Sequence, residues 1–453
     1  MSDLAALSAS AMVEGHLARR FSPVEVLEAT IARIERLDPG LNAVVHIDAD
    51  RARAAARRAE REILAGRPVG PLCGVPVGVK DIVDVAGMPT TCHSRILVGN
   101  TATVDATAVR RLREAGAIIL AKLATHEFAL GGPSLDLPFP PARNPWHMDY
   151  NPGGSSSGSG AAVAASLFPF AVGTDTAGSI RHPAGACGVL GLKPTYDSIP
   201  RDGVFPLAHS LDHVGPLART AGDIDLAFRV MAGLPATDLQ RKEKDGLPVR
   251  RVGYVRHFHS GDVEADPQVS AALDAAVQRL MNLGVEVEEV TLPPLGAFLT
   301  VSRIVMFSEA FAIHSEWLRT RPQDYGALGR QRLMVGAFLT AEDYLQAQRR
   351  RRQLNDAVED VLSHHEVLLV ANMFDPACRL DDAVELVNSG RRQARSPFNA
   401  TGHPAISFCT GFSSAGLPLS GQLVGKRGSE SIVTEIAGLL HEARVPTGAR
   451  AAA

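Results

Sequence analysis

The chain has 453 residues, of which 45% are hydrophobic, and its 46 basic residues nearly balance 49 acidic ones. This composition can supply a large core, and the net charge of −3 argues against nucleic acid as a main partner. The N-terminus lacks a basic start followed by an apolar core, and no twenty-residue apolar span is apparent, so we expect neither a secretory signal nor contact with a membrane. The five cysteines stand singly, which predicts reduced thiols in a cytoplasmic protein, and no H-E-x-x-H pattern indicates a metal site.

The first half of the chain predicts alternating helices and strands. Ser22 and Glu25 form a capping box that starts a helix, which Asp38-Pro39-Gly40 should end. An Arg- and Ala-rich helix follows over residues 49–64. Further elements are expected at 75–79 (strand), 105–115 (helix), 117–120 (strand), 161–166 (helix) and 170–172 (strand). This alternation predicts an α/β fold, with a sheet covered by helices on both faces.

The second half begins after a linker-like stretch, 233–251, whose charged centre is bounded by Gly246. A strand at 251–255, a helix at 267–283 and a strand at 285–291 predict a β-α-β unit. A long helix is expected at 341–363, where the arginines at 349–352 indicate a solvated face rather than a nucleic-acid site. Residues 447–453 are expected to be a frayed tail.

Three residues stand in a pattern that suits acyl transfer. Lys80 follows an apolar stretch, Ser155 lies in the glycine-rich run 153–160, and Ser179 follows 24 residues later in the run 173–181. A serine hydroxyl is a weak nucleophile until a neighbouring group takes its proton. A lysine can be that base only when its amine is held neutral, and the buried strand before Lys80 would strip water from it.

The segment just before Ser179 could bind an oxyanion. Thr176, Ala177, Gly178 and Ser179 are small residues that precede an expected helix start at Ile180. Backbone N–H groups at a helix N-terminus can stabilise developing negative charge. We therefore expect these four residues to form an oxyanion hole.

Other interpretations of these motifs fit less well. Residues 154–158 match the G-x-S-x-G nucleophile elbow, but that elbow must follow a strand directly, whereas 147–152 is polar and turn-like. No Gly-Lys-Ser/Thr ends the run, so it is not a nucleotide-binding loop. A Gly/Ser run alone is typical of a linker. The three features in the required order favour an enzyme over a non-enzymatic scaffold.

At these positions the chain resembles the amidase signature family, whose members use a Ser–cis-Ser–Lys triad. The resemblance begins at 22–26, is densest from Gly74 to Thr220, and returns at 396–404. It implies that Ser179 is the nucleophile, Ser155 the relay at a cis peptide bond and Lys80 the base, with no cofactor. The same four residues become the oxyanion hole, although Ala177 stands where many members have glycine.

The resemblance also implies one amidase domain spanning 1–453, with a central mixed β-sheet that the β-α-β unit joins. Its parts are expected to be N-terminal helices (1–70), a catalytic core (71–232), the linker-like loop (233–251), a C-terminal half completing the sheet and pocket (252–446), and the tail (447–453).

Substrate residues are sought where the chain departs from the family. The loop 131–141, the stretch 372–376 and His182 are such departures, and His182 shares a helix face with Ser179. The residues expected to contact substrate are His182, Ser156, Gly131 and Phe374.

The expected activity is hydrolysis of a small-molecule amide, and the chain could form a homodimer. The segment 203–216 resembles the biuret-hydrolase branch of bacterial amidases, which favours a small polar amide or ureide. The alternative is the amidase subunit of a glutamine-dependent tRNA amidotransferase complex, which would feed ammonia to a partner. The altered stretch 372–376 argues against that alternative.

Overall fold

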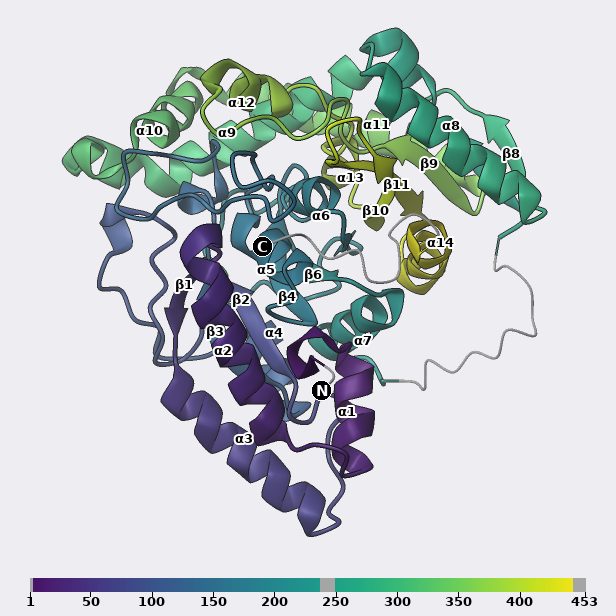
Figure 1. The fold of residues 1–453 in the computed structure, drawn as a ribbon. Helices are drawn as coiled ribbons and strands as arrows, with labels where there is room; N and C mark the ends of the chain where they lie inside the picture. The colour runs from purple at the N-terminus through teal and green to yellow at the C-terminus, as the bar shows by residue number, and fades with distance from the viewer. Residues whose placement is uncertain (1–2, 237–248, 443–453) are drawn as a thin grey trace.

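A single mixed sheet organises the computed structural model, which describes residues 3–236 and 249–442 (Figure 1). Its eleven strands run in the order β1-β3-β2-β4-β6-β5-β10-β11-β9-β7-β8. β2 is parallel to β3 and β4, and β7 is parallel to β8 and β9, while the other pairs are antiparallel. The strands are β1 (Val44–Ile47), β2 (Pro76–Lys80), β3 (Ile118–Leu123), β4 (Phe170–Asp175), β5 (Leu190–Lys193), β6 (His213–Ala218), β7 (Arg251–Tyr254), β8 (Glu286–Glu289), β9 (Val367–Ala371), β10 (Ala405–Phe412) and β11 (Pro418–Gly425).

Helices cover both faces of this sheet, as the alternating pattern predicted. They are α1 (Ala9–Leu17), α2 (Pro23–Leu41), α3 (Ala49–Leu64), α4 (Thr107–Glu114), α5 (Ser157–Ala164), α6 (Arg181–Cys187), α7 (Ala221–Ala232), α8 (Pro267–Asn282), α9 (Leu295–Thr320), α10 (Ala327–Met334), α11 (Ala341–His364), α12 (Ala383–Ser389), α13 (Pro397–Ala400) and α14 (Glu430–Glu442). Along β4, Phe170 and Val172 enter one hydrophobic core, which α1, α4, α7 and α14 also line, while Ala171 enters the other with α2, α3 and α5. Successive residues of a strand point to opposite faces, so β4 separates the two cores.

Most of the expected elements are present, with altered ends. The capping box of Ser22 and Glu25 starts α2, but the helix continues through Pro39 to Leu41. It ends at Asn42, whose φ of +52° is left-handed, and the Asp38 carboxylate accepts the backbone N–H groups of the next two residues. The β-α-β unit is confirmed, because β7 and β8 flank α8 and belong to the common sheet.

The helix that follows Ser155 starts earlier than predicted. α5 begins at Ser157 rather than at residue 161, so the second half of the run 153–160 forms the first turn of a buried helix. Gly158 lies against the backbone of Ala43 and Ala124, where a Cβ would come within 2.4 Å of backbone atoms. Small residues are required here because the helix packs directly on neighbouring backbone.

The sequence predicted that all four arginines at 349–352 of α11 are exposed, but one of them is not. Arg351 is half-buried and donates to the backbone oxygen of Ser210 at 2.8 Å, which ties α11 to the loop before β6. The other three arginines are exposed. The predicted linker lies mostly outside the described residues, as does the predicted tail.

Helix α9 corrects the expectation that the chain has no long apolar span. By length and composition alone, its 26 residues could cross a membrane. Of its most apolar 18-residue segment, 28% is buried within the protein. In this fold α9 packs against α10, α11 and α13 (Figure 1). It thereby forms one wall of the pocket described next.

Candidate active site

Lys80 lies at the end of β2, a fully buried strand between β3 and β4. Its Nζ donates to Ser155 Oγ at 2.7 Å and to Thr174 Oγ1 at 2.8 Å. Burial lowers the pKa of Lys80 to about 7, although the negative charges of Asp175 and Asp212 act in the opposite direction. At this pKa a large share of the amine is neutral near pH 7, so it can accept a proton.

The neighbouring carboxylate faces away from this amine. Asp81 forms a buried ion pair with Lys122, at 3.1 Å, and accepts a hydrogen bond from the Thr91 hydroxyl. Strand alternation accounts for the division, because Lys80 and Asp81 point to opposite sides of the chain. Lys80 therefore has two hydroxyl partners and no direct carboxylate partner among the described residues.

The peptide bond between Gly154 and Ser155 is cis. The Ser155 carbonyl accepts the backbone N–H of His126 at 3.1 Å, and the Gly154 N–H donates to Nδ1 of His182 at 3.2 Å. Both flanks of this bond are thus held by residues outside the serine run, and Ser155 Oγ is directed at Lys80.

Ser156 fixes the serine run to β4 and does not line the pocket. Its hydroxyl donates to the Thr174 carbonyl at 3.1 Å and accepts the Thr174 N–H at 3.2 Å. Its own N–H donates to the carbonyl of Ser179 at 3.1 Å. The expectation that Ser156 contacts substrate is therefore corrected, since its polar atoms are used in holding Ser155 and Ser179 together.

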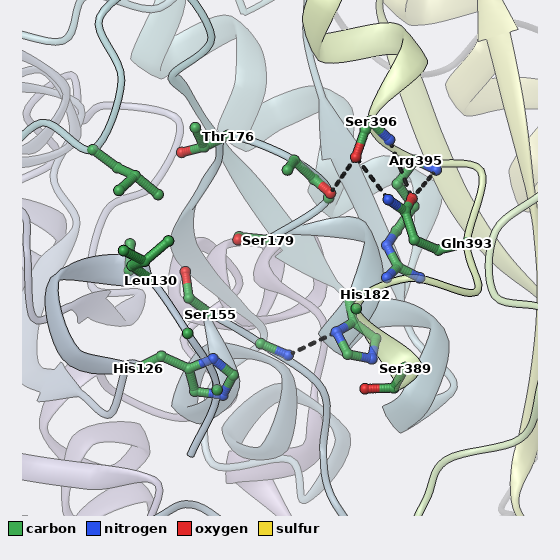
Figure 2. A pocket seen from close by; sticks show the side chains of 18 of the residues that line it. His126, Leu130, Ser155, Thr176, Ser179, His182, Ser389, Gln393, Arg395 and Ser396 are labelled. Carbon is green, nitrogen blue, oxygen red and sulfur yellow. Dashed lines mark hydrogen bonds between the residues drawn. The ribbon is translucent and has the colours of Figure 1, made fainter. Parts of the chain in front are cut away.

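A pocket of about 140 Å³ opens at Ser155 and Ser179 (Figure 2). Its volume lies below the roughly 300–1,000 Å³ typical of sites for drug-sized ligands, which favours a small substrate. Ser179 is partly exposed to it, whereas Ser155 and Lys80 are buried. In Figure 2 the labelled side chains of His126, Leu130, His182 and Arg395 surround the two serines.

Not all backbone N–H groups around the expected oxyanion hole are available to a ligand. The Gly178 N–H donates to Asp175 Oδ1 at 2.7 Å, and the Ile180 N–H donates to Oδ2 of the same carboxylate at 3.1 Å. The prediction that the Gly178 N–H is available to an oxyanion is therefore corrected, because this N–H already donates to the Asp175 carboxylate, which caps the turn before α6. Ala177 and Ser179 remain partly exposed and line the pocket.

Asp175 also carries the charge network beneath the site. It pairs with Arg181 at 3.0 Å, both side chains are fully buried, and Asn399 donates to it at 2.8 Å. Burial alone would raise its pKa, but the positive Arg181 and these hydrogen bonds hold the pKa of Asp175 well below its usual range. Arg181 therefore has a structural partner and does not line the pocket.

Two of the four expected substrate residues line the pocket. They are His182 and Gly131. Phe374 is corrected along with Ser156, because its ring is fully buried in the large core and lies outside the pocket. Hydrophobic burial, rather than substrate contact, explains an aromatic residue at that position.

Sequence reasoning missed several pocket residues. They are His126, Arg303, Met306, Arg332, Gln393 and Arg395. Arg303 and Met306 lie on α9 and Arg332 on α10, helices that the sequence patterns had not revealed. Arg395 directly precedes the 396–404 motif, which was the available signal. Within residues 3–236 and 249–442, no group of three or more His, Cys, Asp or Glu side chains is placed to hold a metal ion.

Comparison with known proteins gives the family. Residues 25–433 match the protein family described as Amidase. A glutamyl-tRNA(Gln) amidotransferase subunit from Symbiobacterium thermophilum is 35% identical over 95% of each chain. A solved structure, described as a vestigial protein complex that reveals the evolutionary origins of an s-triazine catabolic enzyme, is 31% identical, with a TM-score of 0.87 over 96% of this chain and 98% of that one. The solved glutamyl-tRNA(Gln) amidotransferase subunit from Thermotoga maritima is 30% identical, with a TM-score of 0.78 over 96% and 94%. The chain therefore belongs to the amidase signature family, whose members are hydrolases of carbon–nitrogen bonds.

Proposed function

We propose that this protein hydrolyses an amide C–N bond through an acyl-enzyme on Ser179, with Lys80 as base and Ser155 as relay. The observation that carries the proposal is the buried Lys80 amine, 2.7 Å from Ser155 Oγ, beside a pocket that exposes Ser179. A lysine with a pKa of about 7 can exchange protons at neutral pH.

In the first step Ser179 Oγ bonds to the amide carbon as its proton passes to Ser155. The Ser155 proton passes to the neutral amine of Lys80. As the C–N bond breaks, Lys80 returns a proton through Ser155 to the leaving nitrogen, which departs as ammonia or an amine. Water then attacks the acyl group by the same proton route and releases the acid and free Ser179.

The tetrahedral oxygen would be stabilised by the N–H groups of Ala177 and Ser179, with Thr176 beside them. The Gly178 N–H could contribute only after leaving Asp175, which already accepts it at 2.7 Å. The cost of removing an oxyanion donor is typically about 10²–10³ in rate.

Two candidate substrate classes remain under this chemistry. The names of the curated relatives support the second candidate of the sequence analysis, a subunit that hydrolyses glutamine for a tRNA amidotransferase complex, better than the first. The solved structure described as revealing the origins of an s-triazine catabolic enzyme supports a small-molecule amidase. In either case we place the protein in the cytoplasm, in keeping with five cysteines that stand singly in the sequence.

The test is labelling with a fluorophosphonate, followed by assays of ammonia release from glutamine and from aliphatic, aromatic and ureido amides by the purified chain. We expect label on Ser179 and turnover of at least one amide without a partner. Absence of label at Ser179 would refute the proposed nucleophile. Glutaminase activity that appears only on adding a partner subunit would favour the amidotransferase candidate.

A further inference from the structure

The pocket wall carries positive charge without a compensating carboxylate. Three arginines line it, namely Arg303, Arg332 and Arg395, and none of the described lining residues is Asp or Glu. A cleft lined by charge of one sign raises the local concentration of oppositely charged ligands, so a cationic pocket indicates an anionic ligand.

Arg395 is the deepest of the three. It is 3% exposed, its Nη1 donates to the Asn372 carbonyl at 3.1 Å, and its Nε has no hydrogen-bond partner among the described residues. It packs on Gly178, where a Cβ would come within 2.5 Å of that Nε. Burying the Arg395 cation beside Gly178 costs free energy unless an anion pairs with it.

Asp175 forms no ion pair with Arg395. Its negative charge raises the pKa of Arg395, but Asp175 is paired with Arg181, whose positive charge acts on Arg395 in the opposite direction. Burial and the Arg181 charge lower the pKa of Arg395 to about 9, so it remains a cation at neutral pH. On the outer side, Asp375 is paired with Arg392 at 2.6 Å.

Arg303 of α9 and Arg332 of α10 face the same pocket. Within residues 3–236 and 249–442 neither side chain forms an ion pair or donates a hydrogen bond. Burial, together with the positive charge of Arg391, lowers the pKa of both, and Arg303 acts on Arg332 in the same direction. Arg303 is exposed and Arg332 is half-buried, so both side chains are accessible to an anionic ligand in the pocket.

We propose, building on the amidase function above, that the substrate is a small amide with a carboxylate group and no ammonium group, held by Arg303, Arg332 and Arg395. A guanidinium binds a carboxylate through two parallel hydrogen bonds, so these side chains provide geometry as well as charge. An ammonium group would meet three cations and no acidic side chain among the described residues of this pocket. The proposal therefore favours an acidic amide over glutamine, which carries both charges.

The test uses three amides of similar length with the purified full chain. Glutaramate has a carboxylate, valeramide replaces it by a methyl group, and glutamine adds an ammonium group to glutaramate. Succinamate and butyramide repeat the first comparison with one carbon fewer. Because charged hydrogen bonds contribute about 1.5–3 kcal/mol, we expect kcat/KM for an acidic amide to exceed that for its neutral analogue by about 10- to 100-fold. Equal values, or a preference for glutamine, would overturn the inference.

Variants connect this preference to the arginines. Arg332→Gln and Arg303→Gln should each lower the ratio of acidic to neutral kcat/KM by about tenfold or more. Arg330→Gln is the matched control. Arg330 lies on α10 like Arg332, but outside the pocket, and donates to the Pro322 carbonyl at 3.2 Å. An unchanged ratio in both pocket variants would contradict the assignment.

A binding assay separates this inference from the proposed function. Glutarate should slow fluorophosphonate labelling of Ser179, and valeramide at the same concentration should not. If Ser179 is labelled but glutarate gives no protection, the anion site is refuted while the nucleophile stands. If Ser179 is not labelled at all, the proposed function fails, and the substrate ratios alone then decide the anion site.

Discussion

The backbone N–H of Gly154 donates to Nδ1 of His182 at 3.2 Å, which links the serine run to the first turn of α6. Since Nδ1 accepts this bond, the neutral ring carries its proton on Nε2. Burial, with the positive charge of Arg395, holds the pKa of His182 well below its usual range. The ring therefore stays neutral across the physiological range.

His182→Ala should consequently alter the choice of substrate and also lower the rate, because it removes both a pocket wall and the acceptor for Gly154. His182→Asn should recover part of the rate, since an amide oxygen can accept the same N–H. The measurement is kcat/KM for two amides in each variant. If the ratio between the amides stays unchanged and only thermal stability falls, His182 is purely structural.

Ser179→Ala should abolish turnover and leave the fold intact, because it removes the proposed acyl acceptor. Ser155→Ala should be severely but less completely impaired, since water can replace part of a proton relay. Steady-state rates and melting temperatures test both. A fully active Ser155→Ala enzyme, beside an inactive Ser156→Ala enzyme of unchanged stability, would contradict the assigned register.

Activity should rise with pH through a single limb centred at about pH 7, because only the neutral form of Lys80 accepts a proton and its pKa is lowered to about 7. The sign follows from burial, which disfavours the charged amine. Lys80→Arg should not restore activity, because a guanidinium stays charged. The check is kcat/KM measured across neutral pH, from mildly acidic to mildly alkaline buffer, and a wild-type profile in Lys80→Arg would exclude Lys80 as the base.

Phe374→Ala should destabilise the protein by about 3–5 kcal/mol without changing substrate preference, because its ring is buried in the core away from the pocket. Denaturant unfolding gives the stability, and the ratio of kcat/KM for acidic and neutral amides gives the preference. Phe374→Leu, which keeps much of the volume, is the matched control and should lose less stability. A changed ratio in a well-folded Phe374→Leu protein would return Phe374 to the substrate site.

The sequence was most informative where local chemistry decides structure. Helix 49–64 has the predicted bounds because its capping and helix-forming residues act within a few positions. The order Lys80, Ser155, Ser179 likewise identified the residues that meet around the pocket. In contrast, α9 was not assigned, since its apolar side chains are not confined to one face.

Long-range contacts could not be predicted in this way. The sequence predicted that the Gly178 N–H is available, but it donates to the Asp175 carboxylate. Arg181 and Asn399 hold that carboxylate in place from other parts of the chain. Arg395 approaches Gly178 from a distant part of the chain. Only the folded chain brings such groups together, so the sequence could place Arg395 beside the 396–404 motif but could not predict its contact with Gly178.

The proposed catalytic residues and the pocket arginines come from different halves of the chain. Lys80, Ser155 and Ser179 lie in the first half, whereas Arg303, Arg332 and Arg395 lie in the second. Inherited changes in α9 and α10 can thus alter which molecule is held while β2 and β4 preserve the route of the proton. Proteins with this fold can therefore change their substrate while they keep the same catalytic residues, in keeping with the different names that their relatives carry.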